Sequence, residues 1–388
     1  RPAEQEVVGR PPTTGNRVRL LEDGPATYKA MFAAIDGARD HINLETYIFE
    51  DDEVGRKFAD VLLAKQAAGV QVHLIYVSVG SLRTPRGFFE RLREGGGRVH
   101  EFNPVNPLTA KKGWQINNRD HRKLLVADGR IAFVGGINIS DVYSSGSSAT
   151  RSRGPDAKRT NWRDTHVSIE GPAVAEFQKL FIDTWEKSKG DAMPARNYFP
   201  PLKAVGKDVV GAVGSVAEEA PSPIYATFVS AVDSARDHVH ITVAYFIPDP
   251  QSLEVLRDVA QRGVDVKIIL PSHTDFWAVF HAGRSYYDEL LRAGVKIYER
   301  RGALLHSKSV LVDGVWSTVG SSNWDPRSFL HNNELNAVVL GREFAGEMRA
   351  MFDKDLANSD RIDLEQWGRR SLLDRVRETF ARMWEYWL

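Results

Sequence analysis

The sequence contains no cysteine, which excludes disulfide bonds and thiolate metal sites and leaves the redox compartment open. It also carries no net charge, because Lys and Arg together number 51 and so do Asp and Glu. Nucleic acid is therefore not an expected partner, because the chain lacks an overall positive charge. Zero net charge is still compatible with a local basic groove. No apolar run approaches the roughly 18 residues that a membrane-spanning helix needs.

The chain has 388 residues, of which 42% are hydrophobic and 26% are charged. These values are ordinary for a globular protein, and the length allows two or three domains with cores of full size. The first residue is Arg1 rather than Met. We therefore expect that a leader or membrane anchor could have preceded it.

A short constellation of residues occurs twice. The first copy is His121-Arg-Lys123, Asp128, Gly135-Gly136 and Asn138; the second is His306-Ser-Lys308, Asp313, Gly320-Ser321 and Asn323. Both copies fit one template of six positions, five of them identical and the sixth Gly or Ser, and at about one chance in twenty per position such a repeat is not accidental. The repeat predicts a duplicated fold that brings two histidines, two lysines and two asparagines together as a phosphate-handling site.

The duplication extends beyond these motifs. Residues 33–42 and 230–239 read almost alike, and each is followed by an apolar strand, a helix closed by glycine and a second strand. Strands that alternate with helices predict a mainly parallel sheet with helices on both faces. Residues 123–133 and 308–319 each read as two strands joined at an Asp-Gly turn. We expect an α/β fold of two tandem, related domains.

Composition indicates the domain boundaries. We expect an N-terminal arm at 1–24, a first domain at 25–190, a linker at 191–223, a second domain at 224–370 and a C-terminal amphipathic helix at 371–388. The polar, basic segment 144–161 begins shortly after Asn138. It reads either as a surface loop or as a flap over the site.

The repeated residues suit cleavage of a phosphodiester without a metal. The reaction needs a nucleophile at phosphorus, a proton for the leaving oxygen and cations for the equatorial oxygens. His121 and His306 suit the first two roles because imidazole titrates near neutral pH, and the residues alone do not say which one attacks. The expected cations and amide donors are Lys123, Lys308, Asn138 and Asn323.

Each imidazole also needs a partner that orients its far nitrogen. Asp164 and Glu334 occupy corresponding places before the strand that follows each motif, and we expect them to orient the histidines. Asp128 and Asp313 belong to the motifs and are grouped with the catalytic residues. Their places at the hairpin turns nevertheless favour hydrogen bonds that hold the strand ends over contact with substrate.

A metal site is the main alternative for a cluster of histidine and aspartate. The lysine two residues after each histidine disfavours a bound cation, and the sequence has neither HExxH nor a paired-carboxylate spacing. We therefore expect no metal and no other cofactor.

The paired motifs resemble the phospholipase D superfamily, which is defined by HxKxxxxD followed by GGxN or GSxN. Within it, the chain is most similar to bacterial cardiolipin synthases, over about residues 25 to 365. The stretches that carry this finer likeness are LETYIF at 44–49, YVSVGSL at 76–82, NRDHRK at 118–123, GGINIS at 135–140, IEGP at 169–172 and SNWDPRS at 322–328.

The resemblance implies that His121 is the nucleophile, that it forms a phosphohistidine, and that His306 is the general acid. It implies one active site at the interface of two halves related by a pseudo-two-fold axis. The implied activity is metal-independent transfer of a phosphatidyl group from phosphatidylglycerol to the hydroxyl of another phospholipid, with phosphatidylethanolamine as a further candidate substrate. Relatives usually have Asp where this chain has Val77, which puts the identity of the acceptor in doubt.

Three other functions stay open. A phospholipase D hydrolase would use water as the acceptor and release phosphatidic acid. A phosphodiesterase or nuclease of the same superfamily is disfavoured by the neutral net charge. An inactive lipid-binding scaffold is disfavoured because both motifs are complete.

Lipid substrates require contact with a membrane surface. Residues 371–388 place apolar side chains at helical spacing among three arginines, which is typical either of an interfacial helix or of a terminal helix packed on its own domain. The segment 276–280 (FWAVF) reads as the wall of an acyl groove or as core. We expect peripheral association with the bacterial inner membrane, and the oligomeric state stays open.

Overall fold

The structure, a computed structural model, describes residues 11–104, 118–147, 161–217 and 222–383. The first half runs through β1 (Thr13–Glu22), α2 (Asp23–Gly37), β2 (His41–Thr46), α3 (Glu53–Ala67), β3 (Gln71–Val77), α4 (Arg86–Glu94), β4 (Arg98–Phe102), β5 (Arg119–Asp120), β6 (Leu124–Ala127), β7 (Ile131–Gly135), η2 (Asp141–Tyr143), β8 (Trp162–Arg163), β9 (Thr165–Glu170) and α5 (Val174–Lys187).

The second half begins with β10 (Asp208–Ser215) and α6 (Pro223–Asp233). It continues through β11 (His238–Val243), α7 (Pro250–Gln261), β12 (Asp265–Pro271), α8 (Trp277–Arg284), α9 (Tyr287–Arg292), β13 (Lys296–Arg300), β14 (Leu304–Leu305), β15 (Lys308–Val312), β16 (Trp316–Gly320), α10 (Pro326–Leu330), β17 (Asn332–Leu340), α11 (Arg342–Ala357), β18 (Ser359–Arg361), α12 (Leu364–Gly368) and α13 (Leu372–Arg382).

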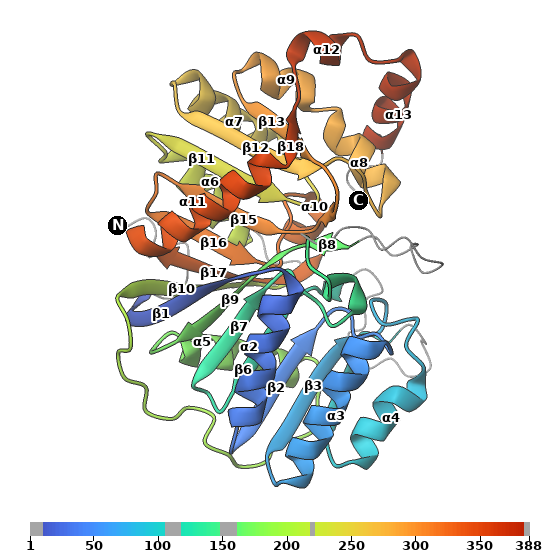
Figure 1. Ribbon diagram of the computed structural model, residues 1–388, viewed down its shortest axis with the longest axis vertical. Coiled ribbons are helices and arrows are strands. Elements are labelled where there is room, and N and C mark those ends of the chain that lie inside the picture. The colour runs from blue at the N-terminus through green and yellow to red at the C-terminus, as the bar shows by residue number, and fades with distance from the viewer. Residues whose placement is uncertain (1–10, 105–117, 148–160, 218–221, 384–388) are drawn as a thin grey trace.

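One large sheet runs through both halves (Figure 1). From the central pair β1 and β10, the strand order is β9-β7-β6-β2-β3-β4 in one direction and β17-β16-β15-β11-β12-β13-β18 in the other. The two series correspond strand by strand as far as β4 and β13, which confirms the predicted α/β fold of two related halves. The motif hairpins β6–β7 and β15–β16 also form as predicted, with Asp128 and Asp313 at their turns.

The expectation of a mainly parallel sheet is wrong. Only the outer trios, β2-β3-β4 and β11-β12-β13, are parallel within the large sheet's path. The strands between them pair in antiparallel fashion, because each motif folds back as a hairpin before the chain leaves the sheet. The result is a mixed sheet whose centre is antiparallel.

The predicted arm and linker also need correction, because each contains a central strand. Strand β1 lies within 1–24 and β10 within 191–223, and they pair with each other, with Thr13 opposite Val210. Their apolar side chains, such as Val18 and Val213, are buried. Burial of these side chains stabilises the two strands. The glycines and nearby prolines in both segments are typical of loops and linkers, which is why the sequence did not predict strands there.

The hydrophobic core does not divide between the halves. Side chains of α5, such as Phe177 and Phe181, share one cluster with side chains of α11, such as Phe344 and Met351. Separate clusters lie beneath α2, α3 and α4 in the first half and beneath α6, α7 and α9 in the second. The seam between the halves is therefore part of the packed interior.

A buried ionic cluster fixes β8 of the first half against the second half. The guanidinium of Arg163 donates to the carboxylate of Asp355 at 2.8 and 3.0 Å, and Arg300 Nε donates to the same carboxylate at 2.9 Å. All three side chains are at most 5% exposed. Such a group is held only when every charge is paired, so it fixes the relative position of the strands that meet there.

Candidate active site

Each motif histidine follows a two-residue strand that pairs with the opposite half. Strand β5 runs parallel to the start of β17, and β14 runs parallel to β8. The backbone N–H of His121 donates to the carbonyl of Asn333 at 2.9 Å, and that of His306 donates to the carbonyl of Arg163 at 2.8 Å. Each imidazole is thus held at the seam by the half that does not encode it.

The orienting carboxylates also cross the seam. Nδ1 of His121 lies 3.1 Å from both carboxylate oxygens of Glu334, and Nδ1 of His306 lies 2.7 Å from Oδ2 of Asp164. Because an ionised carboxylate only accepts, Nδ1 carries the hydrogen in both rings and Nε2 keeps its lone pair. The structure brings the two predicted carboxylates to the two predicted histidines, and their catalytic roles stay a proposal.

Small residues of the motifs make room for these carboxylates. A Cβ on Gly136 would lie 2.2 Å from Oδ1 of Asp164, so only glycine lets that carboxylate reach the strand end. At the corresponding place in the second half, the Ser321 hydroxyl donates to Oε2 of Glu334. The GG and GS dipeptides therefore serve the orienting carboxylates rather than a direct approach to substrate.

The two lysines lie in the same buried site. Nζ of Lys123 donates to the carbonyl of His121, and Nζ of Lys308 donates to that of His306. Burial lowers the pKa of Lys123 to about 7 and that of Lys308 to about 8, and the charge of Lys308 contributes to the shift at Lys123. Two buried lysine side chains whose charges interact, with the carboxylates of Glu334 and Asp164 nearby, are chemically suited to hold the oxygens of a phosphate.

Burial of both histidines favours the neutral imidazole. Burial lowers the pKa of His121 although the Glu334 carboxylate opposes the shift, and burial together with Lys308 lowers the pKa of His306 well below its usual value. Burial also raises the pKa of Asp164 to about 6, which still leaves it ionised above pH 7. A bound phosphodiester anion offsets the lysine charges, so it favours a proton on one imidazole while the other attacks.

The two asparagines sit beside the site with different environments. The side chain of Asn138 accepts from the backbone N–H of Ile48 at 3.1 Å and donates to the Tyr143 hydroxyl at 3.1 Å. Asn323 is buried, and its Oδ1 has no partner among the described residues. Contact of either amide with phosphate stays a prediction. The Asn138 side chain already forms hydrogen bonds with Ile48 and Tyr143.

Asp128 and Asp313 do not belong with the catalytic residues. Asp128 accepts from the backbone N–H groups of residues 39, 40 and 41 at 2.8 to 3.0 Å, and Asp313 accepts from those of residues 236, 237 and 238 at 2.8 to 2.9 Å. Both have positive φ at the hairpin turns. They fasten the turn of each hairpin to the start of the neighbouring strand, which corrects their assignment as catalytic groups.

Aromatic side chains around the histidines escaped the sequence analysis. Tyr47 lies edge-on to His121 with ring centroids 5.0 Å apart, and Lys123 Nζ lies 5.3 Å from the centroid of the same Tyr47 ring. Trp162 lies 4.8 Å from His306, and the Tyr143 hydroxyl is 3.4 Å from Nδ1 of that histidine. Tyr47 belongs to the LETYIF stretch, and Trp162 precedes Asp164 by two residues. Their proximity in sequence to recognised residues was the only sequence feature that could have marked them as neighbours of the site.

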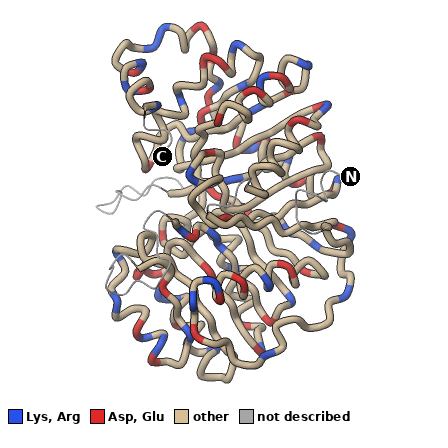
Figure 2. Tube along the Cα trace, turned by 180° about the vertical axis from the view of Figure 1, so that it is seen from behind, with Lys and Arg blue, Asp and Glu red and all other residues tan. Residues whose placement is uncertain are grey.

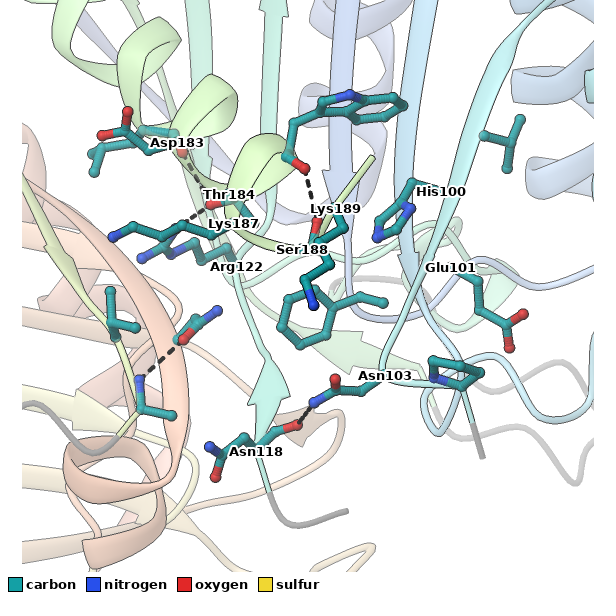
Figure 3. Close-up of a pocket in the computed structure, with 18 of the residues that line it drawn as sticks. His100, Glu101, Asn103, Asn118, Arg122, Asp183, Thr184, Lys187, Ser188 and Lys189 are labelled. Atoms are coloured by element: carbon teal, nitrogen blue, oxygen red, sulfur yellow. Dashed lines mark hydrogen bonds between the residues drawn. The ribbon is translucent and has the colours of Figure 1, made fainter. Parts of the chain in front are cut away.

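Arg122 stands between His121 and Lys123 in the first motif. Its guanidinium donates to the carbonyls of Glu334 at 3.1 Å and Ser215 at 2.7 Å and to the Thr184 hydroxyl. It forms part of the wall of a cavity of about 510 Å³ (Figure 3). Within the described parts of the chain, no group of three or more histidine, aspartate or glutamate side chains could hold a metal ion.

Comparison with known proteins agrees with this geometry. A family described as "Cardiolipin synthase, PLD-like domain" matches residues 31–146 and 228–356. Cardiolipin synthase A of Pseudomonas aeruginosa is 38% identical over 367 residues, which are 93% of this chain and 71% of that protein. Cardiolipin synthase of a Geobacillus species is 36% identical over 381 residues, which are 97% of this chain and 73% of that protein.

Two solved structures share the fold. The phosphatidylserine synthase of Haemophilus influenzae superposes with a TM-score of 0.74 at 13% identity, covering 98% of this chain and 97% of that one. The polyphosphate kinase of Porphyromonas gingivalis gives 0.57 at 13% identity, covering 96% of this chain and 53% of that one. With one matched family segment in each half and curated relatives aligned over nearly its whole length, this chain belongs to the cardiolipin synthase type of the phospholipase D-like family.

Proposed function

We propose that this protein is a phosphatidyltransferase that makes cardiolipin from phosphatidylglycerol without a metal. The observation that carries the proposal is the crossed arrangement at the seam, where each imidazole is oriented by a carboxylate of the other half. This arrangement leaves two Nε2 atoms available to one phosphorus centre, with Lys123 and Lys308 to hold its oxygens.

The reaction takes two displacements at phosphorus. In the first, Nε2 of His121 forms a bond to phosphorus while the bond to the glycerol oxygen breaks, and His306 supplies the proton to that oxygen. In the second, the hydroxyl of the acceptor lipid gives its proton to His306 and attacks, and the bond between phosphorus and His121 breaks. The enzyme returns to its starting state with one proton on His306 consumed and restored.

Hydrolysis to phosphatidic acid is the second candidate, because water could replace the acceptor lipid in the second step. The absent carboxylate at position 77 does not decide between the two. Val77 ends β3 with a side chain only 1% exposed, within the hydrophobic interior. We therefore expect other residues to select the acceptor.

Products from phosphatidylglycerol liposomes, with and without phosphatidylethanolamine, test the proposal by mass spectrometry. We expect cardiolipin as the main product, with glycerol released in equal amount. Phosphatidic acid alone would establish the hydrolase instead, and an unchanged lipid would contradict both.

We also propose that the protein binds to a membrane surface, and the exposed apolar residues of helix α13 support this proposal. Within the described residues no helix is long and apolar enough to cross a bilayer. Helix α13 packs against α8, yet it buries Glu378, which is paired with Arg370 at 2.9 Å, and turns its apolar residues outward. Leu372 is 78% and Met383 is 77% exposed. Packing of the apolar face on the protein, the alternative for this helix, is not seen in its described residues.

Seven of the twelve large apolar side chains that are exposed among the described residues lie in α8 or α13 or directly next to these helices in sequence, and this surface is here termed the α8–α13 face. Its members are Phe276, Trp277, Leu372, Leu373, Val376, Phe380 and Met383. Helix α8 begins just after the carboxyl end of β12, and Figure 1 shows α8 and α13 next to each other at the upper right. Arg375, Arg377 and Arg382 on α13 suit the anionic headgroups of phosphatidylglycerol. Residues 384–388, also expected in this helix, lie outside the described residues.

Replacing Leu373, Val376 and Phe380 together by glutamine is expected to weaken binding to phosphatidylglycerol liposomes by at least about tenfold, because the lost apolar area no longer enters the interface. Cosedimentation measures it. Val315→Gln is the matched control, since Val315 is also exposed but lies at the far hairpin turn of β15 and β16. Equal liposome affinity of the triple variant and wild type would exclude this face as the membrane contact.

A further inference from the structure

The two halves differ at one place beside the catalytic lysines. In the first half, Glu45 of β2 pairs with Leu124, the residue after Lys123. In the second half, Thr242 of β11 pairs with Ser309, the residue after Lys308. Glu45 and Thr242 therefore occupy the same position in the duplicated fold, and only the first carries a carboxyl group.

A second difference lies directly before each motif histidine. Asp120 precedes His121 at the end of β5, and Leu305 precedes His306 at the end of β14. Asp120 is 0% and Glu45 is 1% exposed. The first half thus buries two carboxyl groups next to its lysine where the second half has a hydroxyl and an alkyl side chain.

The hydrogen bonding of this pair requires a proton. Neither oxygen of Glu45 nor Oδ2 of Asp120 has a donor among the described residues, while Oδ1 of Asp120 accepts from the backbone N–H of Arg122 at 3.2 Å. Burial and the neighbouring Asp120 raise the pKa of Glu45 well above its usual value. With a proton, the Glu45 carboxyl can donate to Asp120, and the pair then bears one negative charge.

Charges on several elements face Lys123. Its pKa is lowered to about 7 by burial first, and the charge of Lys308 lowers it further. The carboxylates that oppose this shift are Glu334 of β17, Asp164 before β9 and Asp120 of β5. Glu45 in turn faces Asp120, Arg122 and Lys123. Because Lys123 titrates near neutral pH, the loss of one of these negative charges changes its protonation in the physiological range.

We propose that Glu45 and Asp120 share one proton and that their single negative charge keeps Lys123 protonated for phosphate binding, a task with no counterpart at Lys308. The two residues act through Lys123 and are positioning residues. The inference rests on the phosphate-binding role of Lys123 in the proposed function but not on the identity of the lipids.

Two variants separate charge from structure. The double variant Glu45→Gln with Asp120→Asn removes the negative charge, whereas Asp120→Asn alone would leave a Glu45 carboxyl group that can ionise once the Asp120 charge no longer opposes it. Glu45→Gln alone is the matched control, because its amide still donates to Asp120 and the charge is kept. The affinity for inorganic phosphate is measured by calorimetry between pH 6 and pH 9, with thermal unfolding as a check on folding.

Loss of the negative charge shared by Glu45 and Asp120 is expected to lower the pKa of Lys123 by about one pH unit. The double variant should bind phosphate about twofold more weakly than wild type at pH 6, where about half of its Lys123 is protonated. At pH 8 it should bind phosphate about tenfold more weakly than wild type, while Glu45→Gln keeps the wild-type affinity. The alkaline limb of kcat/KM for phosphatidylglycerol should move in the same direction and by the same amount.

An unchanged pH dependence in the double variant would overturn the inference, and so would an equal loss in Glu45→Gln. A wild-type protein without affinity for phosphate would overturn it as well, since Lys123 would then hold no anion. A wild-type protein that binds phosphate but transfers no phosphatidyl group would instead refute the proposed function and leave the comparison of variants standing.

Discussion

His121→Ala is expected to abolish turnover of phosphatidylglycerol, with a loss of at least about 10³-fold, because no other group can form the covalent intermediate. His306→Ala should also fail on phosphatidylglycerol, whose glycerol oxygen needs a proton to leave. It should keep measurable activity on the p-nitrophenyl ester of phosphatidic acid, because p-nitrophenolate leaves without a proton. Release of p-nitrophenol and of glycerol measures the two cases.

The two variants should remain folded, because each alanine leaves the backbone bonds to Asn333 and Arg163 in place. Thermal unfolding near the wild-type temperature is the control. Equal activity of the two variants on the activated ester would contradict the assignment of His121 as nucleophile and His306 as acid. Exchanged behaviour would reverse the two roles.

Gly136→Ala is expected to lower kcat by about 10²-fold or more, although the substitution adds one methyl group outside the reacting atoms. The new Cβ would meet the Asp164 carboxylate, which must withdraw and release Nδ1 of His306. Loss of the orienting carboxylate leaves an imidazole free to adopt the wrong tautomer or ring position, and in hydrolases with a related dyad this has effects of such size.

Steady-state kinetics on phosphatidylglycerol measure this loss, with Asp164→Asn as a parallel variant that should behave alike. Gly346→Ala is the matched control, since a Cβ at Gly346 of α11 would meet no atom within 4 Å. Wild-type kcat in Gly136→Ala would show that the contact between Asp164 and His306 does not matter for turnover.

The repeated motifs predicted much of the site because they recur in the same order and spacing. They placed His121 and His306 at equivalent positions of the two halves and predicted the hairpins and their turns. The sequence could not say that Glu334 serves His121 and Asp164 serves His306, since that crossing depends on how β5 and β14 pair with the opposite half. It likewise gave no reason for Gly136 beyond its small size, because the Asp164 carboxylate comes from another strand.

The errors also have physical causes. Strand β10 reads DVVGAVGS within a segment rich in proline and glycine, so its role at the centre of the sheet was hidden by composition. The net charge of zero corresponds to residues of both signs interspersed along the trace (Figure 2). Periodicity predicted the amphipathic helix α13, but a pattern of 3.6 residues cannot tell whether the apolar face lies against the protein or faces outward.

The central claim is that both halves act on one phosphorus centre through a covalent bond to His121. Rapid quenching of His306→Ala with an alkaline denaturant during reaction with the p-nitrophenyl ester, followed by peptide mass spectrometry at mildly alkaline pH, tests this most directly, because the bond between phosphorus and histidine breaks in acid. The predicted result is a phosphatidyl group on the peptide that contains His121, formed in step with p-nitrophenol release. A group on the peptide of another residue, or product formation with no covalent adduct at any time, would contradict the account.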